Sequence, residues 1–156
     1  MKYFFNFTNH PSSKWGDEQI AAAKEFGEII DVQFPNIKPE ISDEGVKAII
    51  HNILGGALFY YDEEGESTVQ RRNITLHVMG EMCGFFQSVI FAFQSQCFSK
   101  VVVSTTERKV IEKDGIKTSE FKFIQFREIQ NPLPKIIEDE FKKARASGSA
   151  GMLWDQ

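Results

Sequence analysis

Three short polar clusters contain the side chains best suited to binding and catalysis, and each lies where a predicted β-strand ends. They span residues 9–15, 80–82 and 104–108, and each directly follows an apolar run. In an open α/β sheet the ligand crevice lies outside the carboxyl ends of the strands, so we expect the three clusters to converge there. Hydroxyl, amide and cationic groups dominate them, which predicts an anionic, phosphate-bearing ligand.

The first cluster, Asn9-His10-Pro11-Ser12-Ser13-Lys14-Trp15, connects a predicted strand to a predicted helix, a position that phosphate-binding loops use. Backbone N–H groups, the hydroxyls of Ser12 and Ser13 and the Lys14 ammonium group suit a phosphate, and Trp15 suits stacking on a base. The alternative is a capped loop with a packed Trp15. A dinucleotide-binding glycine pattern and a P-loop are both missing, which argues against NAD and ATP as ligands.

The second cluster is Gly80-Glu81-Met82. Gly80 permits close approach of a ligand to the backbone. Glu81 has two open interpretations. It is either an acid favoured in the first turn of a helix, or a group that orients a sugar hydroxyl or accepts a proton.

The third cluster is Ser104-Thr105-Thr106-Glu107-Arg108, a run of hydroxyls ahead of an arginine. Because guanidinium groups form bidentate pairs with phosphate oxygens, this run is typical of a phosphate clamp. The alternative is that Thr105 and Thr106 continue a strand and that Glu107-Arg108 is a surface pair.

Other catalytic constellations have little support. His10, His51 and His77 show no metal-ligand spacing, so we expect no metal site and no cofactor. No Gly-x-Ser-x-Gly elbow supports a Ser-His-Asp triad. His77 lies inside a predicted strand, so we interpret it as a satisfied core or interface histidine. Cys83 and Cys97 are interpreted as structural thiols of a cytoplasmic protein.

Length and composition predict a single globular domain. The pattern along the chain places this domain at residues 1–146, with an insertion at about 55–72 and a flexible tail at 147–156. The net charge of -4 excludes a non-specific nucleic-acid binder, so DNA is not an expected partner. No apolar stretch approaches the roughly 20 residues that span a bilayer, and no secretory signal pattern follows Met1.

The hydrophobic pattern predicts an α/β, Rossmann-like fold: a mostly parallel sheet flanked by helices, with an antiparallel C-terminal hairpin at its edge. Residues 57–61 are interpreted as either an extra strand or a helix extension. The predicted strands are 3–7, 29–34, 74–79, 100–104 and 118–128, the last following an Asp114-Gly115 turn, and the predicted helices are 17–28, 42–54, 81–96 and 136–145.

Across the three clusters the sequence resembles a known family. Asn-x-x-Asn-His-Pro-Ser-Ser-x-Trp at 6–15, His-Val-Met-Gly-Glu-Met at 77–82 and Ser-Thr-Thr-Glu-Arg at 104–108 are similar to small CRISPR-associated, CARF-related proteins and to the stand-alone ring nucleases of type III CRISPR systems. The resemblance covers roughly residues 3–128. It implies a homodimer that binds a cyclic oligoadenylate, with cyclic tetra-adenylate first among the possible rings, and takes part in antiviral defence.

A ring nuclease cleaves this messenger without metal: the ribose 2′-OH attacks the adjacent phosphate in line, the bond from phosphorus to the 5′-oxygen of the next nucleotide breaks, and that oxygen takes up a proton. The products are a 2′,3′-cyclic phosphate end and a 5′-hydroxyl end. From the chemistry of the residues at the motif positions, His10 is the candidate general acid or base, and Lys14 and Arg108 stabilise charge. The candidate ligand-binding residues are Asn9, Ser12, Ser13, Trp15, Gly80, Glu81, Met82, Ser104, Thr105 and Thr106.

Two other functions stay open. A sensor or sponge has the same pocket but does not align the 2′-OH for attack. A hydrolase or transferase of nucleotide derivatives uses Glu81 or Glu107 as its base, and dependence on a divalent metal favours that third function.

Overall fold

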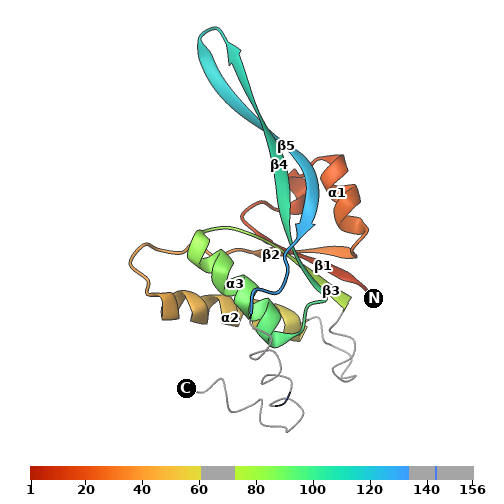
Figure 1. Cartoon of the computed structure of the whole chain (residues 1–156), viewed down its shortest axis with the longest axis vertical. Coiled ribbons are helices and arrows are strands. Elements are labelled where there is room, and N and C mark those ends of the chain that lie inside the picture. Colours follow the sequence, from red (N-terminus) through yellow and green to blue (C-terminus); the bar gives the residue numbers. More distant parts are fainter. Residues whose placement is uncertain (61–72, 134–142, 144–156) are drawn as a thin grey trace.

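The computed structural model describes residues 1–60, 73–133 and 143. Five strands form one sheet in the order β2-β1-β3-β4-β5, in which the first four strands are parallel and β5 is antiparallel to β4 (Figure 1). The predicted α/β class, mostly parallel sheet and antiparallel edge hairpin are confirmed. The elements in chain order are β1 (Tyr3–Thr8), η1 (Ser12–Lys14), α1 (Asp17–Lys24), β2 (Glu28–Gln33), α2 (Asp43–Tyr60), β3 (Ile74–Met79), α3 (Met82–Ser95), β4 (Lys100–Lys113) and β5 (Ile116–Glu128).

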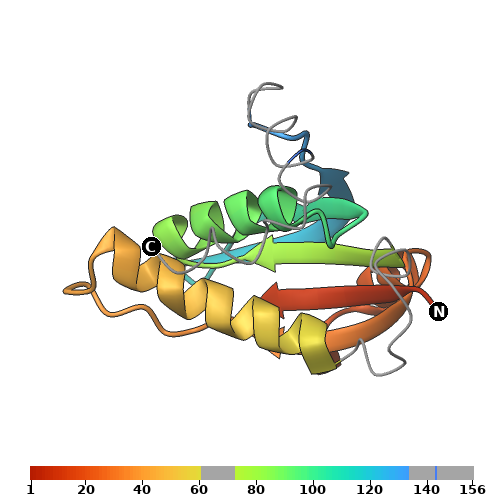
Figure 2. The same ribbon diagram turned by 90° about the horizontal axis from the view of Figure 1, so that it is seen from below.

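Helices cover both faces of the sheet. The helices α2 and α3 lie side by side on one face, where Phe5 and Phe7 of β1 enter the larger of two apolar clusters (Figure 2). On the other face Phe4 packs with Ala23 of α1 in a smaller cluster. Because successive side chains of a strand point to opposite faces, β1 is buried on both sides, as the continuous apolar run predicts.

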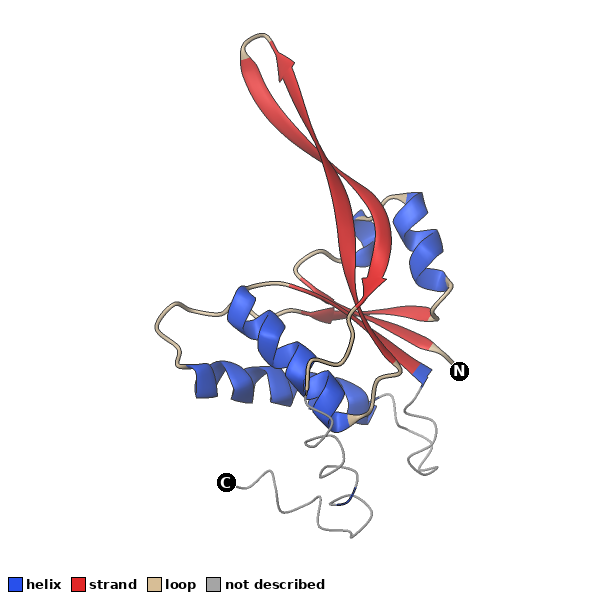
Figure 3. Cartoon of the chain, in the orientation of Figure 1, coloured by secondary structure: helices blue, strands red, loops and turns tan. Residues whose placement is uncertain are grey.

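The hairpin of β4 and β5 projects far beyond the rest of the sheet (Figure 3). Asp114 and Gly115 form its turn with φ of 53° and 74°, the positive values that a two-residue hairpin turn of this kind requires, so the predicted turn is confirmed. The expectation that strand four ends at Ser104 is wrong. Pairing with β5 carries the strand on to Lys113, and opposite charges face each other at three cross-strand pairs, Glu107–Lys122, Lys109–Glu120 and Glu112–Lys117.

Two helix ends differ from the sequence-based expectation. The helix α2 continues through Gly55 and Gly56 to Tyr60, which confirms the helix extension and not the extra strand. Each glycine costs a helix about 1 kcal/mol, but Ala57 and Leu58 pack against the core beyond them and offset that cost. The helix α1 ends at Lys24, earlier than expected, because Gly27 lies against the Lys2 backbone where β2 begins.

Several expectations fall outside the described residues. They are the acidic part of the insertion at 61–72, the helix expected at 136–145 apart from residue 143, and the tail at 147–156. Within the described ranges, no helix is long and apolar enough to cross a membrane.

Candidate functional site

The first two polar clusters meet at the carboxyl ends of β1 and β3. The two strands are adjacent and in register, with Thr8 opposite Met79, so the loops that begin at Asn9 and Gly80 leave the sheet side by side. The chain leaves β1 toward β2 on one side and leaves β3 toward β4 on the other. Such a topological switch point is where open α/β sheets bind ligands.

The loop after β1 presents four polar side chains to solvent. Asn9, His10, Ser13 and Lys14 are exposed, while Ser12 is half-buried. The short helix η1 is closed by hydrogen bonds from the Lys14 N–H to the Pro11 carbonyl and from the Trp15 N–H to the Ser12 carbonyl, each 3.0 Å. The exposed amide, imidazole, hydroxyl and ammonium groups therefore line one edge and suit an anion.

Asp31 of β2 holds this loop on the sheet. Its Oδ1 accepts from the Ser12 backbone N–H at 3.0 Å, and its Oδ2 accepts from the Ser12 hydroxyl at 2.8 Å. The two Ser12 donors that sequence reasoning offered to a phosphate are therefore already bonded to the Asp31 carboxylate. Sequence reasoning missed Asp31, and the available signal was an acid inside the β-branched run of residues 29–32.

A buried polar network lies beneath the loop. Asn6 Nδ2 donates to Asp31 Oδ1 at 2.6 Å and to the His10 carbonyl at 2.9 Å. The Thr8 hydroxyl lies 3.0 Å from both Asn6 Oδ1 and the His10 carbonyl, and it accepts from the His10 N–H. Because Asn6 and Thr8 both bond to the backbone of His10, the network fixes the backbone position of His10 while leaving this residue exposed.

His77 of β3 completes the network from the neighbouring strand. Its Nδ1 lies 3.0 Å from Asn6 Oδ1, and its ring packs against Phe4, Trp15 and Phe126 at centroid distances of 5.7, 5.6 and 5.0 Å. The residue is only 2% exposed, and desolvation by this burial lowers its pKa to about 3. The prediction of a core histidine is confirmed, although Nε2 has no hydrogen-bond partner within the described part of the chain.

Trp15 is half-buried in the same aromatic group. Besides His77, its ring contacts Phe4 edge-on at 6.3 Å and Phe126 at 6.2 Å. These contacts agree with the packed alternative for this residue. Base stacking on any exposed part of the ring stays a prediction.

The second cluster begins α3. Glu81 is the N-cap, and its Oε2 accepts from the Gly84 N–H at 2.9 Å. Backbone hydrogen bonds from Gly84 and Cys83 lower the pKa of Glu81, which makes it a weaker base. At Gly80 a Cβ atom would lie 2.5 Å from the Phe34 ring, so packing of Phe34 explains this glycine without a ligand. The Met82 side chain is exposed.

The third cluster lies within β4 and not at its end. Val102 pairs with His77, so Ser104 lies level with Met79, and Thr105 donates its hydroxyl hydrogen bond to the Gln125 carbonyl at 3.1 Å. A bulge between Thr105 and Thr106 then begins the projecting hairpin.

Arg108 lies ~13 Å farther along β4 than Ser104, at the usual rise of a strand. Its guanidinium donates to Ser119 Oγ at 2.9 Å and lies 6.0 Å from the Phe121 ring centroid. The structure therefore brings Ser104 near the carboxyl edge and does not bring Arg108 there.

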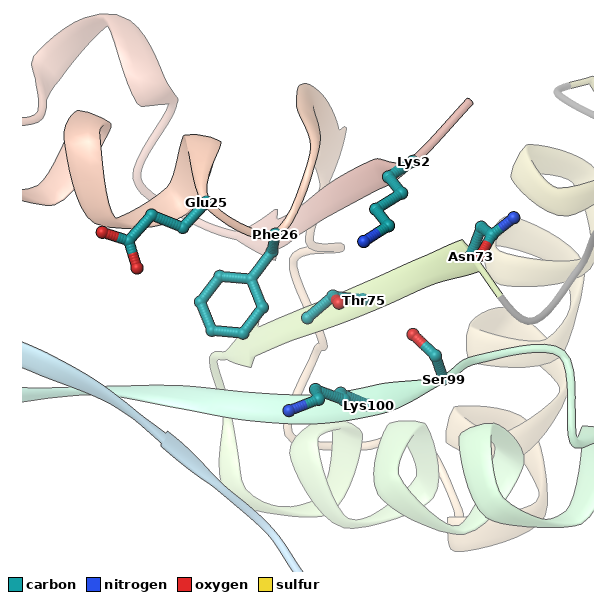
Figure 4. Close-up of a pocket in the computed structure, with 7 residues that line it drawn as sticks. All are labelled: Lys2, Glu25, Phe26, Asn73, Thr75, Ser99 and Lys100. Atoms are coloured by element: carbon teal, nitrogen blue, oxygen red, sulfur yellow. The ribbon is translucent and has the colours of Figure 1, made fainter.

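A separate pocket lies at the opposite end of the strands. It measures about 420 Å³ and lies at the amino ends of β1, β3 and β4, between Lys2, Lys100 and the Phe26 ring (Figure 4). Lys100 is also paired with Glu128 at 3.1 Å. None of the predicted site residues lines this pocket.

Metal binding has no visible basis in the described ranges, where no three His, Cys, Asp or Glu side chains form a group that could hold an ion. Comparison with known proteins matches residues 2–127 of the chain to a family model. The chain belongs to the uncharacterized protein MJ1673 family. No curated protein and no solved structure matches it. The family match spans β1 to β4, all of β5 except Glu128, and both converging clusters, but the family description names no activity.

Proposed function

We propose that this chain binds a cyclic oligoadenylate at the carboxyl edge of β1 and β3 and cleaves it without metal. The observation that carries the proposal is the register of Thr8 with Met79, which sets the two clusters side by side at a topological switch point. In the proposed setting the protein acts as a cytoplasmic homodimer in type III CRISPR antiviral defence, the context that the motif resemblance implies.

The proposed roles follow from exposure and chemistry. His10 is the general acid or base because its ring is exposed and its backbone is fixed by Asn6 and Thr8. Lys14, also exposed, stabilises the charge that develops on the phosphorane, and Asn9 and Ser13 hold phosphate or ribose oxygens. Holding the 2′-OH in line with the phosphate supplies the remaining rate acceleration.

A receptor that binds without cutting is the second candidate, and one observation favours it. Arg108, the second cation expected to stabilise the transition state, lies on the projecting hairpin and donates to Ser119. A single chain therefore places Lys14 at the edge without Arg108, an arrangement that suffices for binding more readily than for cleavage.

The test is incubation of the pure protein with cyclic tri-, tetra- and hexa-adenylate in EDTA, followed by chromatography and mass spectrometry. We expect linear products that end in 2′,3′-cyclic phosphate, and their loss in His10→Ala. Intact ligand that co-elutes with the protein identifies the receptor instead. Turnover that requires added divalent metal identifies the nucleotide-derivative hydrolase, and neither binding nor turnover overturns all three.

A further inference from the structure

The proposed function does not explain the outer edge of β5, which is unpaired among the described strands and lies next to exposed apolar side chains. β5 is the last strand of the sheet, and no described strand pairs with its outer edge. Its backbone N–H and C=O groups along that edge are therefore available to another strand. Ile116 and Phe121 are each 66% exposed, and Val110 on β4 is 60% exposed. A two-stranded hairpin with apolar side chains in water is marginally stable alone, so a partner strand is expected.

We propose that β5 pairs, antiparallel, with β5 of a second copy of this chain, about a two-fold axis through Phe121. This inference does not depend on the ligand or on the proposed cleavage. It joins the two hairpins into one continuous sheet across the dimer.

Charge complementarity favours this register over its two neighbours. With Phe121 opposite its own copy, Glu120 of each chain faces Lys122 of the other. Moving the axis one residue earlier opposes Glu120 to its own copy, and moving it one residue later opposes Lys122 to its own copy. Since like charges directly opposite each other destabilise a sheet, the Phe121 register is favoured over both neighbours.

The faces of the strand agree with the same register. Residues two apart lie on one face, so Ser119, Phe121 and Phe123 share a face in both copies, while Glu120 and Lys122 share the other. An aromatic pair therefore forms at the axis, and two ion pairs form behind it. The charges on β5 do not prevent self-pairing, because the two-fold axis turns them into attractive pairs.

The first test is a charge exchange read by sedimentation velocity. We expect wild type to dimerise, and Glu120→Lys and Lys122→Glu each to weaken self-association at least tenfold. An equimolar mixture of the two variants restores the dimer, because lysines at 120 and 122 of one chain then face glutamates of the other. Each substitution also disturbs a pair within its own hairpin, with Lys109 or Glu107, and mixing cannot repair that pair. Glu44→Lys in α2 is the matched control and stays dimeric.

The second test is a disulfide at the axis. In a Cys83→Ser background, which removes an exposed thiol, Phe121→Cys should form a covalent dimer on mild oxidation. Val110→Cys, exposed on β4 instead, should not. A monomeric wild type, a mixture that stays monomeric, or equal cross-linking at 110 and 121 would overturn the proposal.

Discussion

His77 Nδ1 lies 3.0 Å from Asn6 Oδ1, joining the two central strands directly beneath the candidate site. Asn6 uses its Nδ2 group to donate to Asp31 and to the His10 carbonyl, so its Oδ1 is the acceptor in the pair with His77. Nδ1 of His77 therefore carries a proton, and because burial lowers the pKa of His77 to about 3, the ring is neutral with a lone pair on Nε2. The pair positions the loop that carries His10 without placing His77 in contact with solvent.

Acid should destabilise the protein through His77. The folded state keeps this imidazole neutral down to a pKa of about 3, whereas the unfolded chain takes up the proton near 6.5. The unfolded state thus binds more protons between these values, and stability falls as pH falls through that window. We expect a loss of about 2 kcal/mol between pH 6.5 and 4.5 from this residue.

Urea unfolding across that pH range, compared between wild type and His77→Gln, checks this prediction. The variant lacks a titrating group at this position, so its stability should depend less steeply on pH. His10→Ala, at an exposed position, serves as the control. Parallel pH profiles of wild type and His77→Gln would show that His77 is not buried in its neutral form.

Asp31→Asn should loosen the loop at Ser12. The carboxylate accepts from the Ser12 N–H, the Ser12 hydroxyl and Asn6, and an amide cannot accept all three equally well. We expect a loss of about 1–2 kcal/mol in unfolding free energy, since the Ser12 contacts are exposed. Amide hydrogen exchange at Ser12 should also become faster. Glu28→Gln, an acid-to-amide change at another exposed position of β2, is the control and should leave both readouts unchanged.

A substitution at Gly80 tests whether packing against Phe34 or close approach of a ligand explains the glycine at this position. A Cβ there meets the buried Phe34 ring at 2.5 Å, so Gly80→Ala should cost about 1–3 kcal/mol with no ligand present. Gly55→Ala, in the middle of α2 with nothing within 4 Å, should instead stabilise by about 0.5–1 kcal/mol. Chemical denaturation measures both variants. If Gly80→Ala left the unfolding free energy unchanged, packing against Phe34 would not explain this glycine, and close approach of a ligand would again be its interpretation.

Substitutions of Lys14 and Arg108 test whether the ligand is bound at the carboxyl edge of the sheet or on the projecting hairpin. Lys14→Ala should weaken binding of cyclic tetra-adenylate about tenfold, or ~1.4 kcal/mol, because it removes an exposed cation beside His10. Lys24→Ala, at the far end of α1, is the matched control. Arg108→Ala should change the affinity less than about twofold. Calorimetric titration of the three variants provides the comparison, and an equal loss for Arg108→Ala would mean that the hairpin contributes to the site.

Local sequence patterns were enough to predict the sheet but not where every element ends. The Asp114-Gly115 turn and the alternation after it gave the hairpin correctly, because both signals depend on neighbouring residues. The continuation of β4 past Ser104 was missed, since only pairing with a strand farther along the chain reveals it. The helix α2 passes Gly55-Gly56 for a similar reason: burial of Leu58 against distant residues outweighs a local propensity.

The candidate site was predicted in outline only. The position of the first two clusters at predicted strand ends correctly indicated that they lie side by side, because parallel neighbouring strands bring their carboxyl ends to one edge of the sheet. The partners of the loop were not predictable from the sequence. Asp31 lies 19 residues from Ser12, and His77 lies 71 residues from Asn6, so their hydrogen bonds depend on the strand order. Sequence reasoning placed Arg108 at the edge because it assumed that strand four ends at Ser104.

The most direct test of the proposed site is mapping of amide chemical shifts as cyclic tetra-adenylate is added to the labelled protein. We predict that the shifts concentrate at residues 9–15 and 80–83, around the carboxyl ends of β1 and β3. The pocket at the amino ends of the strands provides the internal comparison, through the amides of Lys2, Phe26 and Ser99. Shifts centred on those three residues, with none at residues 9–15, would contradict the placement of the site.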